Sequence, residues 1–163
     1  MTPQAREPQA YLDALIGQHC LEVTNSAGSV LLIDFANETK QASSLEPSSP
    51  RSTLLVDSPW RVQTEQEVLC DCNAENSPSG ELQTCVVRLV GQKVRTVQVS
   101  LPAYDFVLTF DDGIRLVVFS DADVNREHAW TFFGGEGGTL IAGHCVGRVG
   151  WRVEPGIEQE DDV

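Results

Sequence analysis

Apolar positions along the chain follow two periodicities, a three-and-four-residue spacing that is typical of helices and an alternation that is typical of strands. Helical spacing appears first over residues 8–16, where Leu12, Leu15 and Ile16 fall on one face. Gly17 comes directly after them, and a glycine in that position ends a helix because it takes a left-handed conformation without a Cβ clash. We therefore expect a short helix that stops at Gly17.

The same succession returns in the second part of the chain. Leu15-Ile16-Gly17-Gln18 is matched by Leu89-Val90-Gly91-Gln92, at an offset of 91 − 17 = 74 residues. Residues 82–89 again have helical spacing, and apolar strand-like segments again follow the glycine. Duplication of an ancestral unit explains the match, and chance similarity of a short motif is the alternative.

Strands are predicted where alternating or β-branched segments are bounded by turn residues. The clearest pair flanks Asp111-Asp112-Gly113, because an Asp-Gly pair is favoured in tight hairpin turns. The predicted strands cover residues 19–24, 29–35, 54–56, 60–62, 68–70, 94–101, 106–110, 114–119, 129–133, 139–142 and 149–153.

Two helices and many short strands in this order predict an α+β protein that is mostly antiparallel β-sheet. We expect two pseudo-symmetric halves, each a helix followed by a β-hairpin and further strands, packed in one compact domain. The first half covers residues 1–72 and the second 82–155, with a linker at 73–81 and an acidic tail at 156–163. A serine-rich stretch at 36–53 is expected to be a mobile loop.

Several features of the second half resemble a known family. They are the Leu-x-Gly-Gln motif with its following strand, the hairpin at 106–116, Glu127-His128-Ala129-Trp130, and the late Trp151. With them the chain resembles DUF6188, a family of bacterial domains of unknown function, well over residues 89–151 and more loosely over 15–62. The family implies no activity, so the resemblance adds no catalytic residue.

The charge of the chain narrows the choice of partners. Asp and Glu number 24 against 11 Lys and Arg, a formal net charge of −13. Nucleic acids and anionic membranes would be repelled, whereas a basic protein would be attracted. Solubility alone is another reason for such a charge. No apolar run approaches the ~20 residues of a membrane span, and residues 1–9 lack the apolar core of a signal peptide, so we expect a cytoplasmic protein.

The cysteines are odd in number and lie mostly in apolar segments, which favours reduced buried thiols over a disulfide framework. Together with His19 and His144 they offer soft ligands for zinc, but no second cysteine pair has finger-like spacing. We expect neither a metal nor another cofactor. The five cysteines are Cys20, Cys70, Cys72, Cys85 and Cys145.

Catalytic and calcium-binding patterns are incomplete. Asp121, Asp123 and Asn125 have the spacing that opens an EF-hand loop, but an arginine and a phenylalanine stand where its glycine and bidentate glutamate belong. Glu127 and His128 are adjacent, so on a strand they would face opposite ways and could not act as an acid–base pair. We expect no enzyme activity.

The tryptophans have two readings, as core residues between sheet and helices or as anchors for a partner. We favour the core. They are Trp60, Trp130 and Trp151.

The expected function is therefore binding. We predict a non-enzymatic, immunity-type protein whose acidic surface holds a basic partner, for example a cationic toxin domain. A structural or small-molecule-binding module is the alternative, as a monomer or as a homodimer joined through strand edges. The residues expected to contact the partner are Asp121, Asp123, Glu127, Glu65 and Glu67.

Overall fold

The computed structural model describes residues 8–25, 30–37, 52–73, 80–100, 103–120, 129–134, 139–145 and 148–154, the last two segments as backbone only. Of the sequence predictions, those on Asp121, Asp123, Asn125, Glu127, His128 and the tail at 156–163 lie outside these residues.

Two short helical segments and eleven strands make up the described chain. Each α-helix continues into a 3₁₀ turn: α1 (Pro8–Leu12) into η1 (Asp13–Leu15), and α2 (Glu81–Val86) into η3 (Val87–Leu89). The strands are β1 (His19–Asn25), β2 (Leu31–Ala36), β3 (Ser52–Val56), β4 (Trp60–Gln63), β5 (Val68–Asp71), β6 (Val94–Ser100), β7 (Asp105–Phe110), β8 (Arg115–Val118), β9 (Trp130–Phe133), β10 (Thr139–Cys145) and β11 (Arg148–Glu154).

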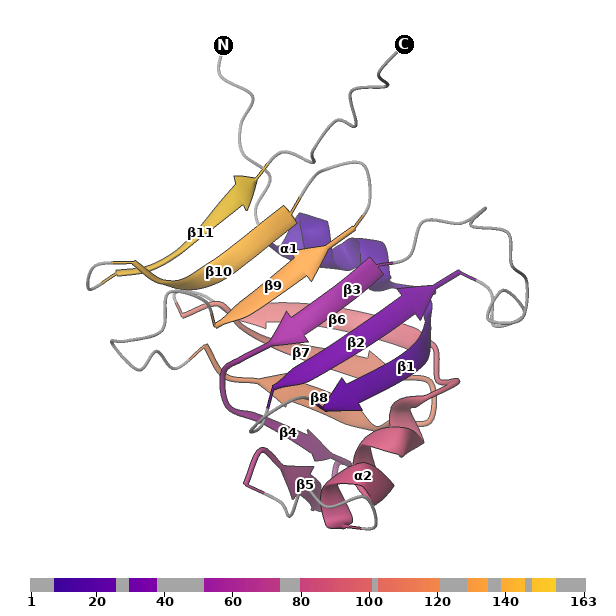
Figure 1. The fold of residues 1–163 in the computed structure, drawn as a ribbon. Helices are drawn as coiled ribbons and strands as arrows, with labels where there is room; N and C mark the ends of the chain where they lie inside the picture. Colours follow the sequence, from indigo (N-terminus) through magenta and orange to yellow (C-terminus); the bar gives the residue numbers. More distant parts are fainter. Residues whose placement is uncertain are drawn as a thin grey trace, which may run out of the picture.

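All strand pairs are antiparallel and form two sheets (Figure 1). A six-stranded sheet has the order β1-β2-β3-β9-β10-β11, and a five-stranded sheet has the order β5-β4-β8-β7-β6. The prediction of an α+β protein dominated by antiparallel sheet, with two short helices, is confirmed. No helix among the described residues is long and apolar enough to cross a membrane.

Both sheets contribute to one hydrophobic core. Inward-facing residues alternate along the strands, as in β7, where Phe106, Leu108 and Phe110 are fully buried. Trp60 and Trp130 are also buried, and the Trp130 ring meets Phe106 edge-on at 5.1 Å. The core reading of these two tryptophans is therefore confirmed, while the side chain of Trp151 lies outside the described part of the chain.

The two halves of the chain exchange strands. One sheet begins with β1-β2-β3 and continues into β9-β10 from the second half, whereas the other runs β6-β7-β8 and continues into β4-β5 from the first. At the two crossover pairs, Val56 lies opposite Trp130 and Val118 lies opposite Trp60. The six-stranded sheet is thus completed by β9-β10-β11 of the second half, and the five-stranded sheet by the β4–β5 hairpin of the first.

Hydrogen bonds at the two Leu-x-Gly-Gln motifs occur in matching pairs. The Gly17 amide donates to the Val94 carbonyl at 2.8 Å, and the Gly91 amide donates to the Cys20 carbonyl at 2.7 Å, so that 91 − 17 = 94 − 20 = 74. β1 and β6 are also irregular at the same offset, after Cys20 and after Val94. A duplicated chain would have these correspondences; the duplication itself stays a prediction.

The first helical segment ends earlier than predicted, whereas the second ends at Leu89 as expected. Residues 8–16 were expected to form one helix with Ile16 on its apolar face, but Ile16 has extended backbone and is 48% exposed. The 3₁₀ turn at Asp13–Leu15 tightens the last turn, and Gly17 follows with φ +89°. Because the 3₁₀ turn changes the angular spacing of the side chains, Ile16 leaves the buried face.

Both ends of the predicted serine-rich loop at 36–53 belong to strands. β2 extends to Ala36 and β3 begins at Ser52. Ser52 is buried because its side chain accepts a hydrogen bond from the Gln18 amide at 3.3 Å. Residues 38–51 lie outside the described chain.

The expectation that all cysteines are reduced is wrong for two of them. Cys70 of β5 and Cys85 of α2 form a disulfide with their Cα atoms 6.2 Å apart. The packing of α2 against β5 brings together residues that are 15 positions apart, a proximity that depends on tertiary structure and not on local pattern. Cys20 is a buried free thiol and Cys72 a half-buried one.

Candidate functional site

Two of the five predicted partner-binding residues lie within the described chain. Glu65 and Glu67 are both exposed in the turn that joins β4 to β5, at one end of the five-stranded sheet. The other three, Asp121, Asp123 and Glu127, fall in residues 121–128, outside the described chain.

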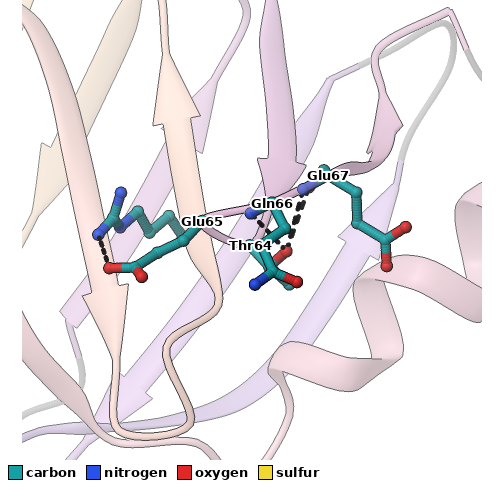
Figure 2. Close-up of polar contacts among 5 residues, drawn as sticks. Thr64, Glu65, Gln66 and Glu67 are labelled. Atoms are coloured by element: carbon teal, nitrogen blue, oxygen red, sulfur yellow. Dashed lines mark hydrogen bonds and ion pairs between the residues drawn. The ribbon is translucent and has the colours of Figure 1, made fainter.

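The threonine at the start of this turn fixes its backbone. The Thr64 amide donates to the Glu67 carbonyl at 2.8 Å, and the Thr64 hydroxyl oxygen accepts from the amides of Gln66 and Glu67, each at 3.2 Å (Figure 2). Threonine forms such turns because its short side chain reaches the backbone two and three residues on. The two glutamates are thus held on an ordered turn.

The glutamate side chains point to opposite sides of the turn (Figure 2). Glu65 forms an ion pair with Arg115 of β8 at 3.0 Å and is still 78% exposed, so water screens the pair strongly. The Glu67 side chain has no hydrogen-bond or ion-pair partner among the described residues. The two carboxylates therefore do not converge on one ligand, but present charge on both sides of a projecting turn.

A second acidic turn lies at the same end of the sheet. Gln63 of β4 is opposite Arg115 of β8, and Arg115 is opposite Thr109 of β7. The β4–β5 turn and the β7–β8 turn therefore lie side by side, because they extend from the same end of the neighbouring strands β4 and β8. The β7–β8 turn carries Asp111 and Asp112, both exposed.

The sequence had indicated this second turn only as a structural feature. Asp112 accepts a hydrogen bond from the Ile114 amide at 2.9 Å, and Gly113 has φ +87°, as the Asp-Gly pair predicts. Its proximity to Glu65 and Glu67 depends on the pairing of β4 with β8, which joins the two halves and has no local signal. We call Glu65, Glu67, Asp111 and Asp112 the acidic end.

Other titratable groups give no sign of a catalytic centre in the described chain. No group of three or more His, Cys, Asp or Glu residues is placed to hold a metal ion there. Burial, with a smaller contribution from the charge of Asp34, raises the pKa of Cys20 to about 12, which leaves the thiol protonated and unreactive at neutral pH. What the acidic end offers chemically is accessible negative charge on a fixed backbone.

Comparison with known proteins adds no relative: no family model, curated protein or solved structure matches the chain.

Proposed function

We propose that this protein is a non-enzymatic protein-binding module of the immunity type, whose acidic end holds a basic partner such as a cationic toxin domain. The proposal includes a cytoplasmic location, where a net charge of −13 would steer a cationic partner at short range.

One observation carries the proposal: two exposed acidic turns, from different strand pairs, lie side by side at one end of a sheet. Four carboxylates on ordered turns repel one another, and a cationic surface that covers them lowers their electrostatic free energy. Arg115 neutralises part of this charge through Glu65, which leaves Glu67, Asp111 and Asp112 as the stronger candidates for contact.

The geometry also constrains the partner. Because the Glu65 and Glu67 side chains diverge, a flat surface would reach one of them at a time, whereas a basic groove would contact both sides of the turn. We therefore expect a partner with Arg or Lys residues lining a concave surface, which the projecting turn enters.

The test is direct binding to candidate basic proteins encoded beside the gene. The protein is titrated with each purified candidate by calorimetry at about 50, 150 and 500 mM salt. Together the three concentrations span about a tenfold range of ionic strength. The proposal expects one candidate to bind with an affinity that falls steeply with salt. Glu67→Lys combined with Asp111→Lys should weaken that binding by about 100-fold or more, as expected when charge pairs become like-charge contacts.

The matched control reverses two exposed acidic residues elsewhere, Glu22 of β1 and Glu81 of α2. Glu22→Lys with Glu81→Lys changes the net charge by the same amount, so binding that falls equally in both double variants would reflect overall charge and not the acidic end. Absence of a salt-sensitive partner among the neighbouring gene products would contradict the proposal.

A homodimer joined through a strand edge is the alternative assembly. The edge of β6 is already covered, because the Gln9 side chain of α1 bonds to the backbone of Val97 and Val99. A dimer would therefore use β1, β5 or β11, which are the other terminal strands. Sedimentation at micromolar concentration separates a monomer from this dimer.

A further inference from the structure

The Cys70–Cys85 disulfide begins three residues after Glu67 of the acidic end. Cys70 belongs to β5, the strand into which the turn with Glu65 and Glu67 leads, and Cys85 belongs to α2. The bond therefore joins the outermost strand of the five-stranded sheet to the helix packed against it.

β5 has few other attachments. It is four residues long and, among the described strands, pairs with β4 alone, with an irregularity between Val62 and Gln63. Cys70 is its one buried residue, whereas Val68 is 55% exposed. A strand end of this kind opens more readily than the core when a constraint is removed.

α2 is anchored independently of the disulfide. Leu82 and Val86 are fully buried beside Cys85, and Leu89 continues the buried face into η3. If the bond were broken, α2 would keep these contacts, while β5 and the residue after it would keep the β4 ladder, the burial of Cys70 and the partial burial of Leu69 and Cys72.

We propose that Cys70–Cys85 is a redox-sensitive clasp: its oxidised form fixes β5 and the β4–β5 turn, and its reduction releases them. Release of the turn would also weaken partner binding at the acidic end, and this consequence rests on the function proposed above. The clasp itself does not depend on that function. Both cysteines are only 6% exposed, so a thiol reductant in a reducing compartment would reach the bond when the end of β5 opens.

The reductant is a protein dithiol of the Cys-x-x-Cys class. One of its thiolates attacks a clasp sulfur and forms a mixed disulfide, and the other clasp cysteine leaves as a thiolate that takes up a proton. The second thiol of the reductant then attacks the mixed disulfide, which releases the remaining clasp thiol. Two electrons pass to the clasp, and the reductant becomes a disulfide.

Hydrogen exchange on the full chain tests the clasp without any partner. The oxidised protein is compared with the same protein reduced by a dithiol, and the β6–β7 hairpin serves as the internal reference. We expect the amides of residues 64–72 to exchange about tenfold faster or more after reduction, while the reference is unchanged. Equal exchange at 64–72 in both forms would overturn the proposal, as would free Cys70 and Cys85 thiols in protein purified under air.

Faster exchange throughout the molecule would also overturn it, because the bond would then support the whole fold instead of one strand. Cys72→Ser is the matched control: it removes the half-buried free thiol two residues away and should leave the difference between the two forms intact. In the Cys72→Ser background, Cys70→Ser with Cys85→Ser should have the fast exchange of the reduced form under all conditions. If that variant fails to fold, the comparison of oxidised and reduced protein still decides.

Discussion

His19 and Lys93 face each other in an isolated antiparallel bridge that connects the first strand of one sheet to the start of β6 in the other. They are 93 − 19 = 74 residues apart, the offset of the sequence repeat, so each residue is paired with its own counterpart. The hydrogen bonds on either side are related in the same way: Cys20 donates to Gln92 and Val94 donates to Gln18, each at 2.8 Å. The backbone hydrogen bonds at this junction therefore form pairs that share the 74-residue offset.

The two glycines beside this bridge should contribute equally to stability. Gly17 and Gly91 have φ of +89° and +84°, and a Cβ added to either would meet nothing within 4 Å. The cost of Gly17→Ala or Gly91→Ala is therefore conformational alone, about 1–2 kcal/mol. Urea denaturation should give the two variants the same loss, with smaller losses for asparagine. A difference above about 1 kcal/mol between the two alanine variants would show that the sites differ in environment.

Gln9 should protect the edge of β6. Its side-chain amide donates to the Val97 carbonyl at 2.9 Å and accepts from the Val99 amide at 2.8 Å, as a neighbouring strand would. Gln9→Ala removes both bonds, together with the exposed bond from the same amide to the Asp13 carboxylate, and is expected to cost about 1–3 kcal/mol, with faster exchange of the Val99 amide. Gln98→Ala, which removes an exposed amide from the same strand, is the control and should change neither quantity.

The indole of Trp130 should matter beyond its volume. Its Nε1–H donates to the Tyr104 carbonyl and to the Ser120 hydroxyl, both at 3.0 Å, in a buried network. Trp130→Phe keeps an aromatic ring against Phe106 but removes both indole bonds, although the Tyr104 carbonyl still accepts from the Ser120 hydroxyl at 2.7 Å; we expect a loss of about 1–3 kcal/mol beyond the volume change. Ser120→Ala removes the Ser120–Tyr104 bond but leaves the indole bonded to the Tyr104 carbonyl, so that every remaining polar group keeps a partner, and it should cost less. Equal losses of unfolding free energy in Trp130→Phe and Ser120→Ala would show that the indole contributes nothing beyond its bond to Ser120.

Stability should fall at alkaline pH through Cys20. Burial raises the pKa of this thiol from 9.0 to about 12, so the folded state holds the proton that the unfolded state releases. The stabilisation is complete below pH 9 and is lost as the pH rises toward 12, by at most about 1.4 kcal/mol per pH unit. Urea denaturation between pH 8.5 and about 10.5 should show a steeper decline for the native chain than for Cys20→Ala. Parallel declines would contradict this role of Cys20.

Local patterns predicted the elements well, because they depend on neighbours in sequence. The Asp111-Asp112-Gly113 turn joins β7 to β8 as expected, and helical spacing located Leu82, Cys85, Val86 and Leu89 on one buried face. The end of the first helix was less predictable, since Ile16 was expected on its apolar face and is 48% exposed. Spacing alone does not reveal a change from α to 3₁₀ geometry.

Pairing between distant segments was not predicted. Nothing near Gln63 indicates that Arg115 lies opposite it, and yet this pairing brings the two acidic turns together. The Cys70–Cys85 bond was missed for the same reason, because it depends on how α2 packs against β5. The candidate site was therefore half visible in the sequence: Glu65 and Glu67 were named, and Asp111 and Asp112 were seen only as turn formers.

The exchange of strands between the halves constrains the order in which the chain can fold. β3 pairs with β9 through Val56 and Trp130, and β4 pairs with β8 through Trp60 and Val118, so the first half has no complete sheet of its own. We therefore expect both sheets to be completed only after most of the second half has been synthesised, because pairings of this sequence separation form slowly. Until then the first half would carry unpaired strand edges, and we expect the chain to fold as a single unit.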